Sequence, residues 1–365
     1  MKKKLLLVSL AISLLPLNAI KADDAATLLS KADKAYGRMQ FDKACDLYKA
    51  YLENDDTNAK AHQRYGACLA AQGHYKSAVV EENKALKIDP QYYLPHVVLG
   101  QIYSNQNKYD DALNEFTQGV KLNPKSVRAK LDLGFILTQK EKFTQAVDVY
   151  TDACKLAPDN PTPFLDLGVV QANKGLYDEA IKTENKALAI DKTLPQAYIN
   201  LGNIYTQSKD SQNAIKSFKA ALNYSPNHPN ALSGLGWAYY QEGNYNDAIK
   251  FQKKAIKLAP NFAPAHRRMA EALAKLNEKD EATREYELAI KINPNDVVSH
   301  VEYAKFLMVN NDKDESFKEF QKALELNPDS LPAKDGLKEL GRINESKDID
   351  KADSPKTTSA NPHKS

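Results

Sequence analysis

The sequence has few of the residues that build catalytic loops. Only 14 of its 365 residues are Gly, and it contains one Trp and three Cys. It has no glycine-rich phosphate loop, no His-Glu-x-x-His and no Gly-x-Ser-x-Gly motif. With 42% hydrophobic and 27% charged residues, the composition favours a soluble, helix-rich protein. We therefore predict that the chain is not an enzyme and needs no cofactor.

The sequence also has no excess of one charge. The formal net charge is +3, but Lys2, Lys3, Lys4 and Lys21 all lie in the first 22 residues. Without them, 46 basic residues face 47 acidic ones, and the net charge is about −1. A protein that neutralises many phosphates needs a surplus of Lys and Arg, so we expect no nucleic-acid partner.

Long apolar runs are missing as well. The longest, Leu5 to Leu17, has 13 residues, which is short of the roughly 20 that cross a bilayer. It follows a Lys-rich start and precedes small residues at Ala19 and Ala22, as in a secretory signal peptide. We predict a signal peptide over 1–22, cleaved after Ala22 or, as the second choice, after Ala19, in preference to a retained anchor. The mature chain should then have no membrane span.

Three cysteines, Cys45, Cys68 and Cys154, cannot all pair within one chain. Cys45 and Cys68 fall in adjacent predicted helices, which allows a disulfide between them. We favour burial as small apolar side chains instead.

What the sequence has in abundance is a 34-residue period. Proline recurs at intervals of 34 or 68 residues. Its positions are 90, 124, 158, 226, 260, 294 and 328. Placing this proline in slot thirty-two gives nine repeats that start at 25, 59, 93, 127, 161, 195, 229, 263 and 297. Proline is tolerated in the first turn of a helix but costs about 3 kcal/mol in its interior, so the period also predicts where the helices begin and end.

Two slots of each repeat hold small residues. Slot eight is Gly in six repeats and Ala in three, and slot twenty is Ala in eight repeats and Ser316 in the ninth. Large residues such as Phe116, Tyr150 and Phe218 fill slot twenty-four. This spacing predicts an apolar stripe on each of two helices per repeat, with close approach at the small residues.

These features resemble the tetratricopeptide repeat family, whose unit is a 34-residue helix–turn–helix. The resemblance covers 25–330 and implies an all-α, right-handed superhelical solenoid of antiparallel helix pairs. One departure is slot four, which is often Trp in the family and is His here in four repeats: His62, His96, His266 and His300. The first repeat is the least typical, as a terminal cap should be. We predict a final capping helix over 331–343 and a disordered tail over 344–365.

Other candidate sites have structural explanations. Equivalent slots of neighbouring repeats lie roughly 8–10 Å or more apart, too far for four histidines to converge on a metal ion, so we predict that they pack. The acidic pairs Glu81–Glu82 and Asp110–Asp111 are predicted to be solvated.

The resemblance places slots two, five, six, nine, twelve and thirteen on an inner, concave face. The residues that this predicts as partner-binding are Val97, Leu131, Phe135, Leu165, Val169, Ile199, Asn203, Trp237 and Tyr240. The alternative is that slots five and nine simply pack between repeats. Chaperone-binding members use five charged and amide residues there, of which only Asn203 and Arg268 have counterparts, so we reject chaperone-tail capture.

We therefore predict an exported, periplasmic or extracellular scaffold that binds a partner protein or peptide in its groove. A glycan-binding solenoid and a regulatory arm of a separately encoded enzyme are the alternatives.

Overall fold

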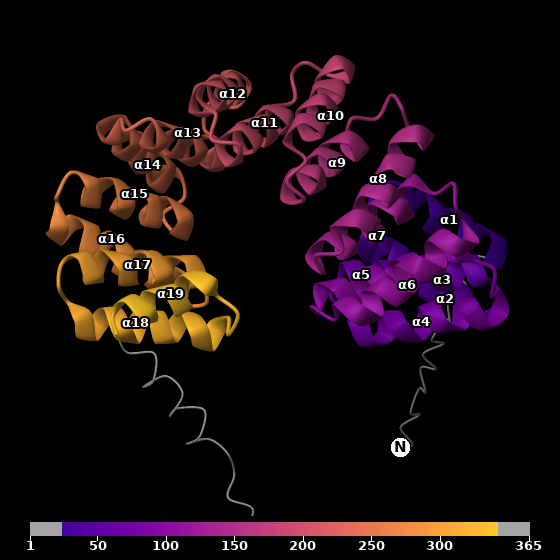
Figure 1. Ribbon diagram of the computed structural model, residues 1–365. Helices are drawn as coiled ribbons and strands as arrows, with labels where there is room; N and C mark the ends of the chain where they lie inside the picture. The colour runs from indigo at the N-terminus through magenta and orange to yellow at the C-terminus, as the bar shows by residue number, and fades with distance from the viewer. Residues whose placement is uncertain (1–23, 342–365) are drawn as a thin grey trace, which may run out of the picture. The chain divides into compact units, whose positions relative to one another are not determined.

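The computed structural model describes residues 24–341. The predicted signal peptide and the predicted tail lie outside the described residues. Within 24–341 the chain forms nineteen α-helices and no strand, which confirms the predicted all-α solenoid of paired helices (Figure 1). It divides into two compact units, residues 1–156 and 157–365, each of which is described by itself.

The first unit contains four helix pairs. Its helices are α1 (Ala25–Gly37), α2 (Phe41–Leu52), α3 (Ala59–Ala71), α4 (Tyr75–Ile88), α5 (Tyr93–Asn105), α6 (Tyr109–Leu122), α7 (Val127–Gln139) and α8 (Phe143–Leu156). Each helix packs against the next, and the first helices of successive repeats also touch.

The second unit contains five pairs and a final single helix. Its helices are α9 (Thr162–Asn173), α10 (Tyr177–Ile190), α11 (Pro195–Gln207), α12 (Ser211–Tyr224), α13 (Pro229–Gln241), α14 (Tyr245–Leu258), α15 (Ala263–Lys275), α16 (Lys279–Ile292), α17 (Val297–Val309), α18 (Lys313–Leu326) and α19 (Leu331–Glu339). The helices α9, α11, α13 and α15 pack in that order and form one face of this unit.

The helices begin where the period predicts. Eight of the nine first helices start at slot one of their repeat. The exception, α9, starts one residue later because Pro161 is its N-cap and Pro163 lies in its first turn. The last helix begins at Leu331 but ends at Glu339, short of the predicted residue 343. Leu340 is its C-cap, and Gly341 follows at φ 75°, a left-handed conformation that ends a helix.

The turn inside each repeat needs a left-handed residue at slot fifteen. All nine repeats have positive φ there, between 55° and 82°, yet only three of these residues are Gly. The next residue closes the turn by donating its N–H to the carbonyl five residues back, as Asn244 does to Tyr239 at 2.9 Å. The conformation is therefore imposed by the repeat, and glycine is optional.

The core forms where slot eight meets slot twenty-four. A Cβ placed on Gly134 would lie 2.6 Å from the Tyr150 ring, and one on Gly202 would lie 2.7 Å from the Phe218 ring. These glycines allow the two helices of a repeat to approach around a large side chain.

Slot twenty-four is polar in three repeats, which the sequence analysis missed. Glu82, Glu184 and Gln252 stand there and are fully buried. Glu81 is 8% exposed, so the prediction that Glu81–Glu82 is a solvated pair is wrong; Asp110 and Asp111 are exposed as predicted. The error arose because burial at slot twenty-four follows from the repeat and not from side-chain polarity. All three cysteines are buried, as predicted, and Cys45 and Cys68 do not form a disulfide with each other.

Candidate binding site

A cavity of about 340 Å³ opens on the face that α9, α11, α13 and α15 form in the second unit. Its walls come chiefly from slots six, nine, twelve and thirteen of repeats 5 to 8, and Phe218 of α12 contributes from below. The residues that carry its chemistry are Val169, Asn173, Asn203, Gln207, Trp237 and Arg268. No carboxylate lines it, so apolar, amide and cationic groups meet there without an acid.

An aromatic stack forms one wall of this cavity. Tyr240 follows Trp237 by three residues on α13, and their rings stack with centroids 4.7 Å apart and planes 9° apart. The guanidinium of Arg268, from α15, lies 5.6 Å from the Trp237 ring. The stack and the cation restrict each other's rotamers, so the wall is held in place before a ligand arrives.

Arg268 has no acidic partner. Its Nη1 donates to the hydroxyl of Ser233 at 3.0 Å. Among the described residues no carboxylate lies within ion-pairing distance, whereas its neighbour Arg267 pairs with Glu271 at 2.5 Å. Burial and then the charge of Arg267 lower the pKa of Arg268 to about 10, so it is still charged at neutral pH. A guanidinium that lines a cavity, with most of its donors uncommitted, is suited to bind an anionic group.

The opposite wall carries amides. Asn200 donates from Nδ2 to Oε1 of the buried Glu184 at 2.9 Å and accepts from Gln196 at 2.8 Å, so its orientation is fixed. Burial raises the pKa of Glu184 to about 9, and its Oε2 has no hydrogen-bond partner. Glu184 is therefore neutral at pH 7 and supports Asn200 without adding negative charge to the cavity.

The structure separates the predicted partner-binding residues into four groups, the last of which is Phe135 alone. Val169, Asn203 and Trp237 line the cavity, and Tyr240 stacks behind Trp237. Leu131 and Leu165 are partly buried. Val97 and Ile199 are each 4% exposed, so the prediction does not hold for these two. Slot five of their repeats points between neighbouring helices, and both side chains belong to the core.

Phe135 belongs to the first unit. Its side chain is 49% exposed and lines a separate cavity of about 300 Å³ with Gln101, Arg128 and Asp132. There Gln101 donates to Asp132 at 2.9 Å, and Arg128 pairs with the same carboxylate at 3.3 Å. The charges of this smaller cavity therefore satisfy one another, unlike Arg268 of the second unit.

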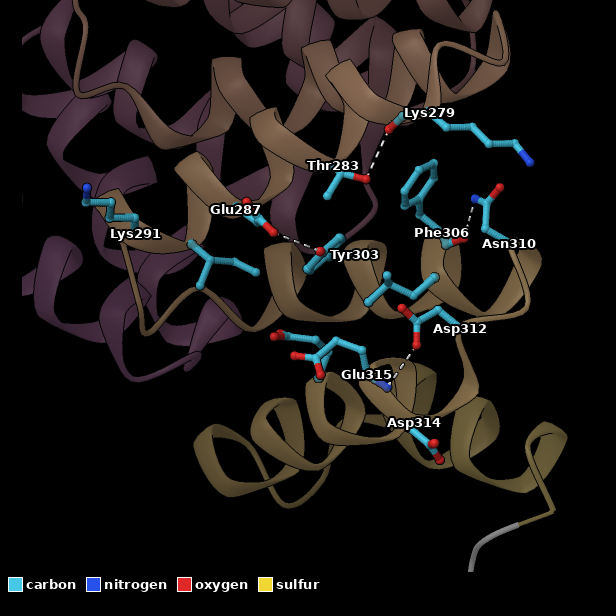
Figure 2. Close-up of a pocket in the computed structure, with 13 residues that line it drawn as sticks. Lys279, Thr283, Glu287, Lys291, Tyr303, Phe306, Asn310, Asp312, Asp314 and Glu315 are labelled. Carbon is cyan, nitrogen blue, oxygen red and sulfur yellow. Dashed lines mark hydrogen bonds between the residues drawn. The ribbon is translucent and has the colours of Figure 1, made fainter.

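Sequence reasoning missed a larger cavity of about 760 Å³ between α16, α17 and α18 (Figure 2). Its floor contains Tyr303 and Phe306, and Glu287 and Glu315 extend into it from opposite sides. The signal for it was Tyr303, which occupies slot seven where five repeats have Leu. Most of its acidic groups are engaged by neighbours, as Glu315 is by Lys318 at 2.6 Å.

The histidines of slot four pack as predicted, but each also pairs with a glutamate. His62, His96, His266 and His300 contact a Glu of the second helix of their own repeat. Across residues 24–341 no group of three or more His, Cys, Asp or Glu could hold a metal ion. Over the same residues, no helix is both long and apolar enough to cross a membrane.

Comparison with known proteins agrees with this architecture. The family model described as the cilia and flagella-associated protein 70 C-terminal domain, a tetratricopeptide repeat domain, matches residues 93–296. No curated protein sequence matches the chain.

Three solved structures have the same fold. A tetratricopeptide repeat protein from Parabacteroides merdae has 17% identity and a TM-score of 0.59, over 68% of this chain and 98% of that one. The human IFIT1 dimer with m7Gppp-AAAA has 14% identity and a TM-score of 0.58, over 90% and 89%. The APC/C hetero-tetramer Cut9–Hcn1 has 22% identity and a TM-score of 0.55, over 80% of this chain and 57% of that one.

The present chain thus spans little more than half of the chain it matches in the Cut9–Hcn1 structure. These structural likenesses establish the fold alone. Because the family model covers more than half of the sequence, the chain belongs to the tetratricopeptide repeat family, in the group described as the cilia and flagella-associated protein 70 C-terminal domain.

Proposed function

We propose that the chain is an exported, non-catalytic scaffold that binds a partner protein or peptide in the cavity of α9, α11, α13 and α15. The observation that carries this proposal is Arg268, a half-buried cation in a cavity without any acid. Desolvating a charge is unfavourable unless a partner offsets it. Within residues 24–341, Arg268 has the Ser233 hydroxyl, the Trp237 ring and the charge of Glu271 beyond ion-pairing distance, but no paired carboxylate. A ligand with an anionic group at Arg268 and an apolar side chain near Trp237 and Val169 supplies what is missing.

The binding experiment compares two variants with matched controls. Trp237→Ala removes the aromatic wall, and Arg268→Gln removes the charge but keeps a donor. The controls are Leu258→Ala, an exposed apolar residue on α14, and Lys253→Gln, an exposed cation on the same helix. Each chain is immobilised and incubated with a native envelope extract, and captured proteins are identified by mass spectrometry.

We expect Trp237→Ala to lose one captured protein, because the change should cost about 2 kcal/mol or more of binding free energy. Arg268→Gln should bind the same protein more weakly. Both controls should retain it. Equal capture by Trp237→Ala and wild type, with unchanged circular dichroism, would show that the aromatic wall serves packing alone. Capture of glycans in place of protein, on the same variants, would favour the glycan-binding alternative.

Export is part of the proposal and rests on the anatomy of residues 1–22: a Lys-rich start, a short apolar run and small residues at the cut site. N-terminal sequencing of the native protein should return Asp23 from a periplasmic or extracellular fraction. Recovery of Met1 in the cytoplasm would overturn this part and leave the binding site untouched.

A further inference from the structure

Four repeats contain the same contact between their two helices, buried in one and partly buried in the other three. The Nδ1 atom of each slot-four histidine lies within 2.7 Å of a glutamate oxygen of slot twenty-three. The pairs are His62–Glu81 at 2.6 Å, His96–Glu115 at 2.7 Å, His266–Glu285 at 2.6 Å and His300–Glu319 at 2.5 Å. In every pair the glutamate follows its histidine by nineteen residues.

The two residues occur together or not at all. The remaining repeats fill slots four and twenty-three with Leu28–Leu47, Lys130–Val149, Phe164–Thr183, Tyr198–Ser217 and Leu232–Phe251. No repeat has the glutamate without the histidine or the histidine without the glutamate. The pair is therefore a unit, and other pairs, four of them uncharged, take its place in the same fold.

The second ring nitrogen also faces an acceptor. In the last two repeats, Nε2 of His266 lies 3.0 Å from the Pro260 carbonyl oxygen, and Nε2 of His300 lies 2.9 Å from that of Pro294. A neutral imidazole has one N–H and can satisfy only one of two acceptors. Both contacts are made when the pair holds one extra proton, whether that proton resides on the imidazole or on the carboxyl group.

Each protonated pair joins three segments. His266 connects α15 to Glu285 of α16 and to the turn before α15. His300 connects α17 to Glu319 of α18 and to the turn before α17. Arg268 lies two residues after His266 on α15, so the segment that His266 holds also forms a wall of the candidate cavity.

We propose that one proton on each of the pairs His266–Glu285 and His300–Glu319 latches the last two repeats closed, and that this latch regulates the cavity through α15. The regulatory part rests on the proposed function, whereas the latch itself does not. Repeats 5 to 7 lack the pair, so the latch is confined to α15–α18 within the second unit.

The charges around these histidines support the sign of the effect. Burial opposes a charged imidazole, but the hydrogen bonds to Glu285 and Pro260 outweigh it and raise the pKa of His266 above 6.5. Burial likewise opposes charge on His300, as does the more distant Lys322, yet Glu319 and Pro294 raise its pKa. Since the folded pKa is raised, the stabilisation is complete below about pH 6.5 and is lost as the pH rises through the folded pKa.

The test replaces both pairs by one that the chain already uses. The variant H266L/E285F/H300L/E319F carries the Leu232–Phe251 combination of repeat 7 in repeats 8 and 9. Hydrogen exchange, expressed as protection factors, is followed from about pH 6 to about pH 9 in wild type and variant. Wild-type protection in α15–α18 should fall by up to about tenfold per pH unit for each proton released, and the variant should lack the part of this slope that the two pairs cause. Burial also raises the pKa of Glu271 on α15, and that contribution is common to both chains. Amides of α13–α14 provide the internal control, because their repeat carries Leu232–Phe251 and has Gln252 where repeat 5 has the buried Glu184.

Two further measurements keep the test decisive. Nitrogen-15 NMR of wild type should show that both nitrogens of His266 and His300 stay protonated to a higher pH than those of a free imidazole. If the proton resides on the glutamate, Glu285→Gln and Glu319→Gln will remove the slope. These conservative variants also serve if the fourfold change does not fold.

Identical slopes in α15–α18 for wild type and the folded variants would overturn the latch. Capture of the Trp237-dependent protein at about pH 6 and about pH 8.5 tests the regulation, since wild type should lose it at the higher pH and the fourfold variant should not. Loss in both would overturn the regulatory part. Failure of the proposed function would look different, because Trp237→Ala would then bind normally at every pH.

Discussion

Replacing Glu184 by Gln should stabilise the second unit, and by an amount that grows with pH. Glu184 is fully buried between α9, α10 and α11, and burial raises its pKa from 4.5 to about 9. The folded chain thus keeps a proton that the unfolded chain releases above pH 4.5. The stability of wild type therefore falls between about pH 4.5 and about pH 9, and at pH 7 the loss is about 3 kcal/mol.

Glutamine avoids this loss because it has no proton to release. Its Oε1 can still accept from Asn200, as Oε1 of Glu184 does at 2.9 Å. Repeat 7 already carries Gln252 in the same slot, where Nε2 donates to the Ser233 carbonyl at 2.9 Å. The substitution is therefore compatible with the packing of this fold, and the difference in stability should come from the charge.

The measurement is urea denaturation at about pH 5, 7 and 8.5, followed by the fluorescence of Trp237, which reports on the second unit only. The free energy of unfolding should differ little at pH 5 and by about 3 kcal/mol at pH 7 in favour of Glu184→Gln. The control is Glu179→Gln, an exposed position on α10, which should change little at any pH. A constant difference between pH 5 and pH 8.5, or none, would refute the argument that a buried neutral carboxyl limits stability.

Two further changes test the packing of the repeat. Gly202→Ala should lower the stability of the second unit by about 1 kcal/mol or more, because the added Cβ would lie 2.7 Å from the Phe218 ring and the overpacking would outweigh the better helix propensity of Ala. Gly37→Ala, whose Cβ would meet nothing within 4 Å, should not lower stability. Equal denaturation midpoints for the two variants would contradict this reasoning. Glu141→Gly should stabilise the first unit by up to about 1 kcal/mol, because φ is 55° at this position and Gly175 occupies the same slot in the next repeat. A loss of thermal stability would show that the contacts of the Glu141 side chain contribute more than the strain of its backbone costs.

The period predicted most of the fold because proline and small residues report directly on helix ends and helix contacts. It could not reveal the division at residue 156, because the repeat continues there without insertion or change of length. It also could not show which apolar inner residues are core. Val97 and Val169 look alike in sequence, yet one is 4% and the other 39% exposed, because slots five and nine point in different directions.

The site was predictable in part. The slots of Trp237, Asn203 and Val169 predict their place in the site, whereas Arg268 matches only part of a known motif and its slot alone does not indicate a role. Its significance lies in what surrounds it, namely a cavity without acid, and that is a property of four helices together. The His–Glu pairs are predictable from sequence, since a glutamate follows each slot-four histidine after nineteen residues. This regularity becomes visible only when slots four and twenty-three are compared together.

The alternation of slot-four pairs has a consequence for folding fidelity. A chain of nine nearly equivalent repeats risks docking a first helix onto the second helix of the wrong neighbour, and such misassembly is a characteristic failure of repeat proteins. Moving His266 opposite Phe251 would bury a polar ring without its carboxylate, and moving Leu232 opposite Glu285 would bury a carboxylate without its imidazole. From repeat 4 to repeat 8 the chemistry at this contact differs at every step. From repeat 4 to repeat 8 the slot therefore lets a helix distinguish its own partner from an almost identical one nearby, whereas repeats 2 and 3, and repeats 8 and 9, share the same pair.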